Sequence, residues 1–380
     1  MPILSSAKNK FKFIIIRVLA PAILKVLFFF VPRKKNTLLI VKNDGIGDHL
    51  LFRNYLEFLK NAEKYKHYKI YLLANRASKD LALHLDSDTV DGFYWYADGF
   101  FLKWDLVKLL FALQRLRIQT IIYPNYSRKY VADELINSIN AKTKIAVDGD
   151  LINQSAALKS NGDKYYSQLI SVDTVPLHEF DRNKQIFEAL TGEQCQLSAP
   201  FIKKDHLNIT PNKSIVIFPG ASTADKKWPA SSFNKLCQSI ISNLNINIIA
   251  AGGKDDEKEL SLIGHNFPGG KFSALPDLNL IGLCQLIGGA RLLISGDTVA
   301  IHIAAALAVP AVCISKGDLY GRFVPYPSTI THNIHTVFPA NYTADIKNYD
   351  QYSSFTINDI RVQDVYHIIE KVITAQALNK

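Results

Sequence analysis

The sequence predicts an α/β protein built from two doubly wound domains that face a cleft. Short continuous apolar runs alternate with segments of helical period, turns containing glycine follow several of these runs, and the whole pattern occurs twice in the chain. Apolar runs of strand length are typical of parallel strands covered on both faces. Their alternation with helices predicts repeated βα units, and such halves place a ligand at the carboxyl ends of their strands.

The 380 residues suffice for two or three domains. We expect a basic and apolar segment over 1–35, a first α/β domain over 36–200, a second over 201–356, and a C-terminal helix over 357–380. A polar stretch over about 150–210 lacks strong periodicity and contains prolines, so it is the expected connection between the domains.

Apolar runs predict the strands of each half. In the first half they lie at 38–41, 69–74, 120–123 and 144–147, and in the second at 215–218, 246–251, 291–295 and 311–315. A helix is expected over 48–62, where apolar residues share one face. Further helices are expected at 230–243, 255–264, 279–288, 299–308 and 357–377.

Composition limits the kind of partner. Hydrophobic residues make up 48% of the chain and charged residues 21%, which excludes a disordered protein. A net charge of +10 suits nucleic acid, an anionic membrane or a phosphate-bearing ligand. The sequence contains no compact run of Lys and Arg with interleaved aromatic residues, so nucleic acid is not an expected partner.

The four cysteines are expected to be buried thiols in a reducing compartment. They are Cys195, Cys237, Cys284 and Cys313, and they form neither a C-x-x-C pair nor a cluster with zinc spacing. No metal site is therefore expected.

Residues 11–32 form an apolar segment that Arg17 and Lys25 interrupt. Each of these charges would cost ~2.5–3.5 kcal/mol at the centre of a bilayer, and other lysines and arginines flank the segment. We therefore expect an amphipathic helix lying on the cytoplasmic face of a membrane rather than a span. The alternative is a buried hairpin packed on the first domain.

The first motif is the strand-turn-helix sequence Val41–Asp48, with Gly45 and Gly47 in the turn. Glycines there allow a close approach of the backbone to a ligand. Asp48 falls where the helix is expected to start, so it is either the N-cap or a carboxylate that accepts a proton from a substrate hydroxyl. The motif contains neither a P-loop nor a G-x-G-x-x-G fingerprint.

The second motif, Phe218–Pro229, joins a strand to a helix and contains Ser222, Thr223, Lys226 and Lys227. Hydroxyls and cations suit an anionic, phosphate-bearing ligand, and the alternative is a solvated basic loop. Because successive side chains of an extended segment face opposite sides, one lysine is expected to face the ligand and the other to face solvent.

The third motif, Ile294–Ala306, joins a strand to an alanine-rich helix whose first N–H groups form a potential anion site. His302 lies one turn into that helix. It is either a satisfied core residue or part of the anion site, and the sequence favours neither.

Together these motifs resemble glycosyltransferase family 9, the bacterial lipopolysaccharide heptosyltransferases, from about Thr37 to about Tyr326. The first matches the family's strand-loop pattern ending in Gly-Asp, the second its Pro-Gly-Ala-Ser … Lys-x-Trp-Pro, and the third its Ser-x-Asp-Thr-Gly-x-x-His-x-Ala-Ala-Ala. Residues 141–149 resemble a short strand of the family, and 321–326 resemble its late cleft loop. The chain departs from the pattern at Val299, where the family usually has glycine.

The resemblance implies a GT-B architecture of two Rossmann-like domains, the first binding the acceptor and the second the donor. It implies an inverting transfer of heptose or a related sugar that requires no metal and no cofactor. The donor would be a nucleotide-diphosphate sugar such as ADP-heptose. The acceptor would be lipopolysaccharide or another lipid-linked glycan, at the cytoplasmic face of a bacterial inner membrane. A non-catalytic protein that binds nucleotide sugars or glycans with the same fold is the alternative.

By motif position, the resemblance implies that Asp48 is the general base and that Lys226 contacts the donor diphosphate. The other implied donor-binding residues are Ser222, Thr223, Asp256, Glu257, Asp297, Thr298 and His302. The acceptor-side candidates are Asp44, Gly45 and Gly47.

Overall fold

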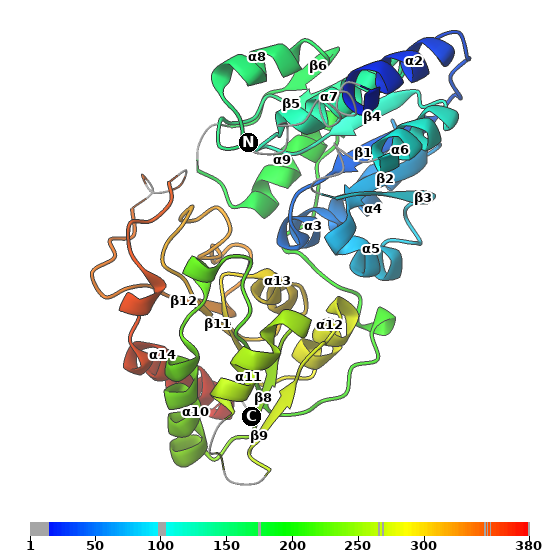
Figure 1. Cartoon of the computed structure of the whole chain (residues 1–380). Coiled ribbons are helices and arrows are strands. Elements are labelled where there is room, and N and C mark those ends of the chain that lie inside the picture. Colours follow the sequence, from blue (N-terminus) through cyan, green and yellow to red (C-terminus); the bar gives the residue numbers. More distant parts are fainter. Residues whose placement is uncertain are drawn as a thin grey trace. The chain divides into compact units, whose positions relative to one another are not determined.

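The chain folds into two compact units in a computed structural model (Figure 1). The structure describes residues 15–97, 104–173, 176–264, 267, 270–345, 347, 349 and 351–378. Unit 1 comprises the chain to His49 with Tyr55–Thr174 and Arg182–Cys195. Unit 2 comprises Leu50–Asn54, Val175–Asp181 and the chain from Gln196 onward.

Unit 1 is built on a six-stranded sheet in which every neighbouring pair is parallel. The strands are β1 (Thr37–Lys42), β2 (Lys69–Asn75), β3 (Gly92–Tyr96), β4 (Thr120–Tyr123), β5 (Thr143–Val147) and β6 (Gln168–Ile170), in the order β3-β2-β1-β4-β5-β6. The helices of this half of the chain are α2 (Ala20–Leu27), α3 (Ile46–Phe52), α4 (Asn54–Asn61), α5 (Lys79–Leu85), α6 (Trp104–Arg115), α7 (Tyr130–Ser138), α8 (Ala156–Asp163) and α9 (Glu179–Thr191).

Unit 2 repeats the same topology. Its strands are β7 (Ile215–Phe218), β8 (Ile248–Ala251), β9 (Phe272–Leu275), β10 (Leu292–Gly296), β11 (Ala311–Ile314) and β12 (Ile334–Val337), in the order β12-β11-β10-β7-β8-β9. Counted from the first strand of each unit, both sheets have the order 3-2-1-4-5-6, which is that of a doubly wound nucleotide-binding sheet. The helices are α10 (Ala230–Leu244), α11 (Glu257–Ile263), α12 (Leu280–Gly288), α13 (Val299–Ala306) and α14 (Val362–Leu378).

The prediction of two doubly wound α/β domains is confirmed, but the sequence did not reveal the four edge strands β3, β6, β9 and β12. Side chains of these strands are mostly half-buried or exposed, whereas β1 is buried at every position. An edge strand is covered less completely, so β6, β9 and β12 lack the continuous apolar run that marks a central strand. β3 is a continuous aromatic run and was nevertheless not predicted. The helix expected over 48–62 is also two helices, interrupted at Arg53, whose Nη1 donates to the carbonyl of Phe201 at 2.9 Å.

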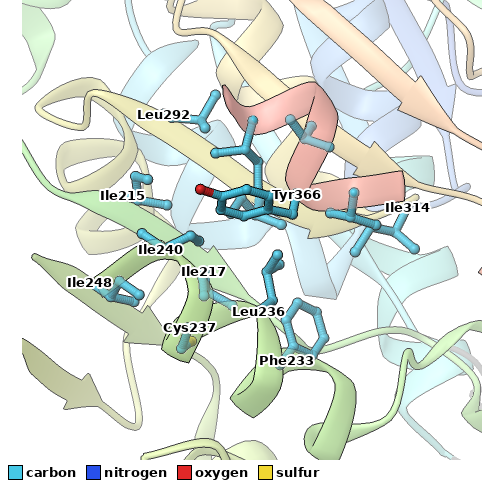
Figure 2. Packing of buried hydrophobic residues seen from close by; sticks show 14 of the residues in the cluster. Ile215, Ile217, Phe233, Leu236, Cys237, Ile240, Ile248, Leu292, Ile314 and Tyr366 are labelled. Carbon is cyan, nitrogen blue, oxygen red and sulfur yellow. The ribbon is translucent and has the colours of Figure 1, made fainter. Parts of the chain in front are cut away.

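The expected C-terminal helix is α14, and it belongs to the core of unit 2. Its inner face contributes Val365, Tyr366, Ile369, Val372 and Ile373 to the same buried cluster as β7 and α10. Figure 2 shows Tyr366 among the side chains of that strand and helix. The indole N–H of Trp228, from the second motif, donates to the carbonyl of Ile360 at 3.1 Å just before α14, so the tail also holds the loop of this motif.

The apolar N-terminal segment forms a short π-helical turn, Ile15–Leu19, followed by α2. Ile16 and Leu24 join the core of unit 1, and α2 packs on α6 and α7 (Figure 1). Residues 1–14, with the lysines at 8, 10 and 12, lie outside the described residues. Within the described part of the chain, no helix has the length and apolar character needed to cross a membrane.

Candidate functional site

The centre of the unit 2 sheet lies between β7 and β10, which pair in parallel from Leu292 with Ile215 to Ser295 with Phe218. In this topology the connections on either side of the central pair leave in opposite directions, and ligands bind outside the carboxyl ends of these strands. The second and third motifs both follow these two strands. The fold therefore brings the two motifs that the sequence selected for an anionic ligand to the same sheet edge.

Helix α13 begins at this edge, and Thr298 is its N-cap. The hydroxyl oxygen of Thr298 accepts the N–H of Ala300 at 3.3 Å and lies 3.0 Å from the hydroxyl of Ser295. Val299 is the first residue of the helix, so it has an ordinary helical backbone. The valine found in place of the family's glycine therefore leaves the helix N-terminus intact, and this N-terminus carries the positive end of the helix dipole.

Two lysines approach the same strand ends. The Nζ of Lys226 lies 3.9 Å from Oδ2 of Asp318, and the Nζ of Lys316 lies 3.4 Å from the same oxygen and 2.7 Å from Oδ2 of Asp225. A small cavity there is lined by Lys226, Asp297, Ile314, Ser315, Lys316, Asp318 and Ile357. Burial raises the pKa of the Asp297 carboxyl, while the nearby charge of Lys226 opposes this shift. The ammonium groups of Lys226 and Lys316 thus lie beside carboxylates at these strand ends.

Lys227 does not face solvent as expected, but forms ion pairs in a different direction from Lys226. Its Nζ lies 2.9 Å from Oδ1 of Asp256 and 3.0 Å from Oε2 of Glu259, at the carboxyl end of β8. The opposite orientations agree with the alternation expected for an extended segment. The expectation of a solvated Lys227 is wrong because the helix that follows β8 presents two carboxylates to it.

Asp256 occupies the tip of the second strand of the unit, where dinucleotide-binding sheets place the acid that contacts a ribose. Its Oδ2 accepts the N–H of Gly253 at 3.1 Å. A Cβ at Gly220 would lie 2.7 Å from Oδ2 of Asp256, and one at Gly252 would lie 2.7 Å from its Cβ. The glycines are therefore required for the carboxylate to lie against the loop. The other ribose candidate, Glu257, is exposed at the start of α11.

Ser222 and Thr223 are exposed in the loop that leads to the 3₁₀ turn Ala224–Lys226. They lie at the same strand end as Lys226, and their assignment as phosphate contacts stays a prediction. The structure thus brings Lys226, Asp297 and the N-terminus of α13 together, with the hydroxyl pair on the exposed side of the same loop.

His302 is buried in unit 2, and its Nδ1 lies 2.7 Å from the hydroxyl of Tyr326. Desolvation, together with the nearby His178, lowers the pKa of His302 to about 3. His178 is also neutral, because burial lowers its pKa to about 4. The hydrogen bond that its Nε2 donates to the carbonyl of Phe323 at 2.9 Å opposes this shift without cancelling it. Of the two alternatives, the structure supports the satisfied core residue. The loop 321–326 closes over it, with Arg322 bonded to buried Glu179 at 3.1 Å.

The centre of the unit 1 sheet lies between β1 and β4, and polar side chains follow both strands. Asn125 donates its amide to Oδ1 of Asn43 at 3.2 Å, and both residues are buried. The amide nitrogen of Asn43, Oδ1 of Asn125 and Oδ1 of Asp44 are buried without a hydrogen-bond partner in the structure. Buried polar atoms of this kind are costly unless a ligand or water satisfies them, so this sheet edge is suited to a hydroxyl-rich ligand.

Asp44 and Asp48 have different roles in the turn of the first motif. Oδ2 of Asp44 lies 2.5 Å from Nζ of Lys42, whose side chain is fully buried, so Asp44 is the counter-charge of an interior cation. Helix α3 begins at Ile46, so Asp48 is not its N-cap. Asp48 instead lies in the first turn, where its Oδ2 accepts the N–H of Gly45 at 3.1 Å. Gly45 and Gly47 leave this turn without side chains at two positions. Their contact with an acceptor stays a prediction.

Sequence reasoning missed Lys316, Asp318 and Asn125. Each follows a strand that the apolar pattern had revealed, β11 or β4, within four residues. A charged or amide residue directly after a buried parallel strand was therefore the available signal. Among the described residues, no group of three or more His, Cys, Asp and Glu is arranged to hold a metal ion.

Comparison with known proteins supports the interpretation of the second and third motifs. Residues 167–344 match glycosyltransferase family 9 (heptosyltransferase). A search of curated proteins found no match. The chain is similar to the E. coli heptosyltransferase WaaC solved with ADP, at 18% identity and a TM-score of 0.67, over 88% of this chain and 97% of that one.

Two further solved structures have the same fold. ADP-heptose lipopolysaccharide heptosyltransferase II of E. coli is 15% identical, with a TM-score of 0.66 over 90% of this chain and 99% of that one. A family 9 glycosyl transferase of Veillonella parvula is 15% identical, with a TM-score of 0.67 over 90% and 98%. The predicted GT-B fold and the predicted resemblance to family 9 are both confirmed.

The neutral histidines predict a pH dependence of unit 2. Both have an ordinary pKa of 6.5 and a lowered pKa, of about 3 and about 4, in the folded protein. Below pH 6.5 the unfolded chain binds protons that the folded unit does not, so stability should fall as the pH falls. Each histidine should cost up to ~1.4 kcal/mol per pH unit between pH 6.5 and pH 4.

The measurement is urea unfolding between pH 7.5 and 5, followed by the fluorescence of Trp228. The chain has 3 tryptophans, so Trp95→Phe and Trp104→Phe leave one reporter, in the core of unit 2. His302→Asn should reduce the pH slope by about one proton, whereas His367→Asn, on the exposed face of α14, should not. Equal slopes in both variants would show that the pKa of His302 is not lowered in the folded protein.

Proposed function

With the resemblance to family 9 glycosyltransferases established over residues 167–344, we propose that the protein is an inverting glycosyltransferase. It transfers heptose or a related sugar from a nucleotide-diphosphate donor to a hydroxyl of lipopolysaccharide or another lipid-linked glycan. The observation that supports this most directly is the pair of lysines, Lys226 and Lys316, beside the N-terminus of α13 at the central strand ends of unit 2.

The donor diphosphate is assigned to these lysines. In the structure their ammonium groups are balanced by Asp225 and Asp318, and Asp318 is itself buried between them. A diphosphate placed there would replace carboxylate contacts with charge-assisted hydrogen bonds from both lysines. The N–H groups at the start of α13 would add to them. Ser222 and Thr223 would bond the same phosphates from the exposed side of the loop.

The nucleoside is assigned to the neighbouring strand end. Asp256 is held by Lys227 and by the N–H of Gly253, so its carboxylate has a defined position next to Gly220. A ribose hydroxyl could donate to this carboxylate, in the manner of dinucleotide-binding sheets. Two adjacent lysines thus have separate tasks, because Lys226 would bind the leaving group and Lys227 would position the acid that binds the ribose.

The acceptor is assigned to the strand ends of unit 1, where the polar groups of Asn43 and Asn125 face each other. Asp48 would be the general base and Asp44 would not, because the Asp44 carboxylate is the counter-charge of buried Lys42. Asp48 lies partly exposed in the first turn of α3.

The reaction is then a single displacement. Asp48 takes the proton of the acceptor hydroxyl as its oxygen attacks the anomeric carbon. The bond from that carbon to the diphosphate breaks on the opposite side, and its electron pair leaves with the phosphate oxygen. Positive groups aimed at this developing charge lower the barrier by ~3–4 kcal/mol per donor in comparable sites. The lysines and the helix dipole supply them, so we expect no requirement for a metal ion.

The proposal is tested by a transfer assay in excess EDTA. The full chain is first screened with nucleoside diphosphates by thermal shift, and the matching nucleotide sugars are then offered with lipid-linked glycan acceptors. We expect a product with inverted anomeric configuration in the presence of EDTA. Strict dependence on added magnesium or manganese would contradict this account of the leaving group. Specific donor binding without any transfer would favour the non-catalytic binding protein instead.

Lys226→Ala should weaken binding of ADP ten- to hundred-fold, because a charge-assisted phosphate contact contributes ~1.5–3 kcal/mol. Its affinity for adenosine should not change. Lys227→Ala should weaken ADP and adenosine equally and by less than tenfold, because it loosens Asp256 rather than a phosphate contact. Isothermal titration of each variant measures both ligands.

Lys235→Ala, in the exposed face of α10, is the control with the same change of charge. Equal losses of ADP affinity in all three variants would indicate a diffuse basic surface. An effect of Lys227→Ala confined to ADP would reverse the tasks assigned to the two lysines.

Asp48→Asn should lower turnover ~10²–10⁴-fold, the usual contribution of a general base. The amide oxygen of asparagine can still accept the N–H of Gly45, so the melting temperature and the affinity for ADP should stay the same. Asp44→Asn should behave differently. It removes the counter-charge of buried Lys42 and should destabilise unit 1 by ~3–5 kcal/mol.

The measurements are steady-state kinetics and thermal unfolding of both variants. Near wild-type turnover in Asp48→Asn would exclude the proton-accepting role and leave Asp48 as a helix-stabilising residue.

A further inference from the structure

Helix α2 lacks the polar outer face of an ordinary helix on the surface of a globular unit. A surface helix normally turns its apolar stripe inward and its polar residues outward. In α2 and the turn after it, the outward residues are apolar, and their exposed fractions are 56% for Ile23, 67% for Val26, 64% for Leu27 and 86% for Phe30. The one polar residue of the helix, Lys25, instead reaches across to α7.

The inward side of α2 packs into the core of unit 1. The outward side chains are therefore exposed when the unit is folded. Pro21 and Leu24 are buried, and the ring of Phe28 makes an edge contact with Phe111 of α6 at 5.9 Å between centroids. Phe111 is itself 45% exposed. Helix α6 therefore adds a further exposed apolar side chain beside Phe28. A patch of this kind on a soluble unit marks an interaction site.

Three cations gather at the edge of this surface. The Nζ of Lys25 donates to Oδ1 of Asn137 at 3.1 Å, and the Nζ of Lys144 donates to the backbone carbonyl of the same residue at 3.1 Å. The guanidinium of Arg33 donates to the carbonyls of Phe29 and Val31 at the end of the segment. These three residues are the basic cluster.

The positive charges of the basic cluster act on one another. Burial, together with the charges of Lys25 and Arg33, lowers the pKa of Lys144 to about 7. An anionic phosphate would relieve this repulsion. Lys25 also lines a cavity of about 330 Å³ under α2, with Pro21, Leu106 and Leu110 among its walls. The walls of this cavity also include Glu134, Asn137 and Ser138, so the space beside the ammonium group is of mixed polarity. The exposed Lys34 and Lys35 follow the cluster in the chain.

We propose that the outer face of α2 and the basic cluster dock the protein onto a bilayer that contains anionic lipids, with α2 lying in the plane of the interface. Apolar side chains would enter the acyl boundary while the cations bind lipid phosphates, as in other interfacial helices. The 8 residues of α2 measure only ~12 Å, far short of the ~30 Å hydrocarbon layer, so the helix lies on the membrane.

A second copy of the chain fits this surface less well. A two-fold contact places a surface against itself, so the basic clusters at its edge, and Lys34 and Lys35, would be brought toward their own copies. Like charges at close range oppose such a contact. An anionic bilayer has the complementary charge, and it can cover the whole apolar face at once.

The experiment is flotation of the full chain with vesicles of phosphatidylcholine alone or mixed with phosphatidylglycerol. Wild type should float with the mixed vesicles, and at least tenfold less in 1 M salt or with the neutral vesicles. The triple variant Val26→Gln, Leu27→Gln and Phe30→Gln should bind the mixed vesicles at least tenfold less. Lys25→Gln with Lys144→Gln should remove the preference for anionic lipid. Deleting the segment would be less informative, because Ile16 and Leu24 belong to the core of unit 1.

The matched control is Leu151→Gln, Leu262→Gln and Leu378→Gln, which removes apolar side chains of similar exposure, 54%, 58% and 83%, from other surfaces. The control should float as wild type does. The proposal is overturned if wild type does not float with anionic vesicles, or if the α2 variant and the control bind equally. It is also overturned if wild type is a dimer in solution that only the α2 variant dissociates, without flotation of either.

Discussion

The parallel direction of the strands decides where this protein can bind ligands. All carboxyl ends in a parallel sheet meet at one edge, and the reversal of strand order at β1 with β4, and at β7 with β10, makes the middle of that edge the place where connections diverge. Asp48 and Asn125 owe their position in unit 1 to this geometry, and Lys226 and Thr298 owe theirs in unit 2. The same constraint applies twice, so each unit has one suitable edge.

Charge balance then distinguishes residues that look alike in the sequence. Lys226 and Lys227 are neighbours, yet one approaches Asp318 and the other pairs with Asp256 and Glu259. Asp44 and Asp48 are separated by one turn, and Asp44 pairs with the buried Lys42 while Asp48 accepts the backbone N–H of Gly45. A buried charge needs a partner, so the contacts made in the folded protein distinguish the two members of each pair.

Helices α2 and α14 show that amphipathic character alone does not tell which way a helix faces. Tyr366 and Ile369 of α14 turn into the core and its charged residues face out. In α2 the inner positions are apolar too, but Val26 and Leu27 also remain exposed, and Lys25 is directed inward by Asn137. Exposing these apolar side chains to water costs free energy, and contact with another apolar environment would remove that cost.

Much of the fold could be predicted from the sequence, because the central strands are buried on both faces and therefore appear as unbroken apolar runs. The motif residues could be identified as well, since Gly, Asp and Lys follow those runs directly. The edge strands β6, β9 and β12 could not, because partial exposure mixes polar residues into these short segments, and the aromatic run of β3 was not recognised as a strand. Nor could the sequence decide between the two roles of His302, the orientation of Lys227, or the place of Lys316. Each of these depends on groups far along the chain, Tyr326, Asp256 and Asp225, that only tertiary packing brings within hydrogen-bond distance.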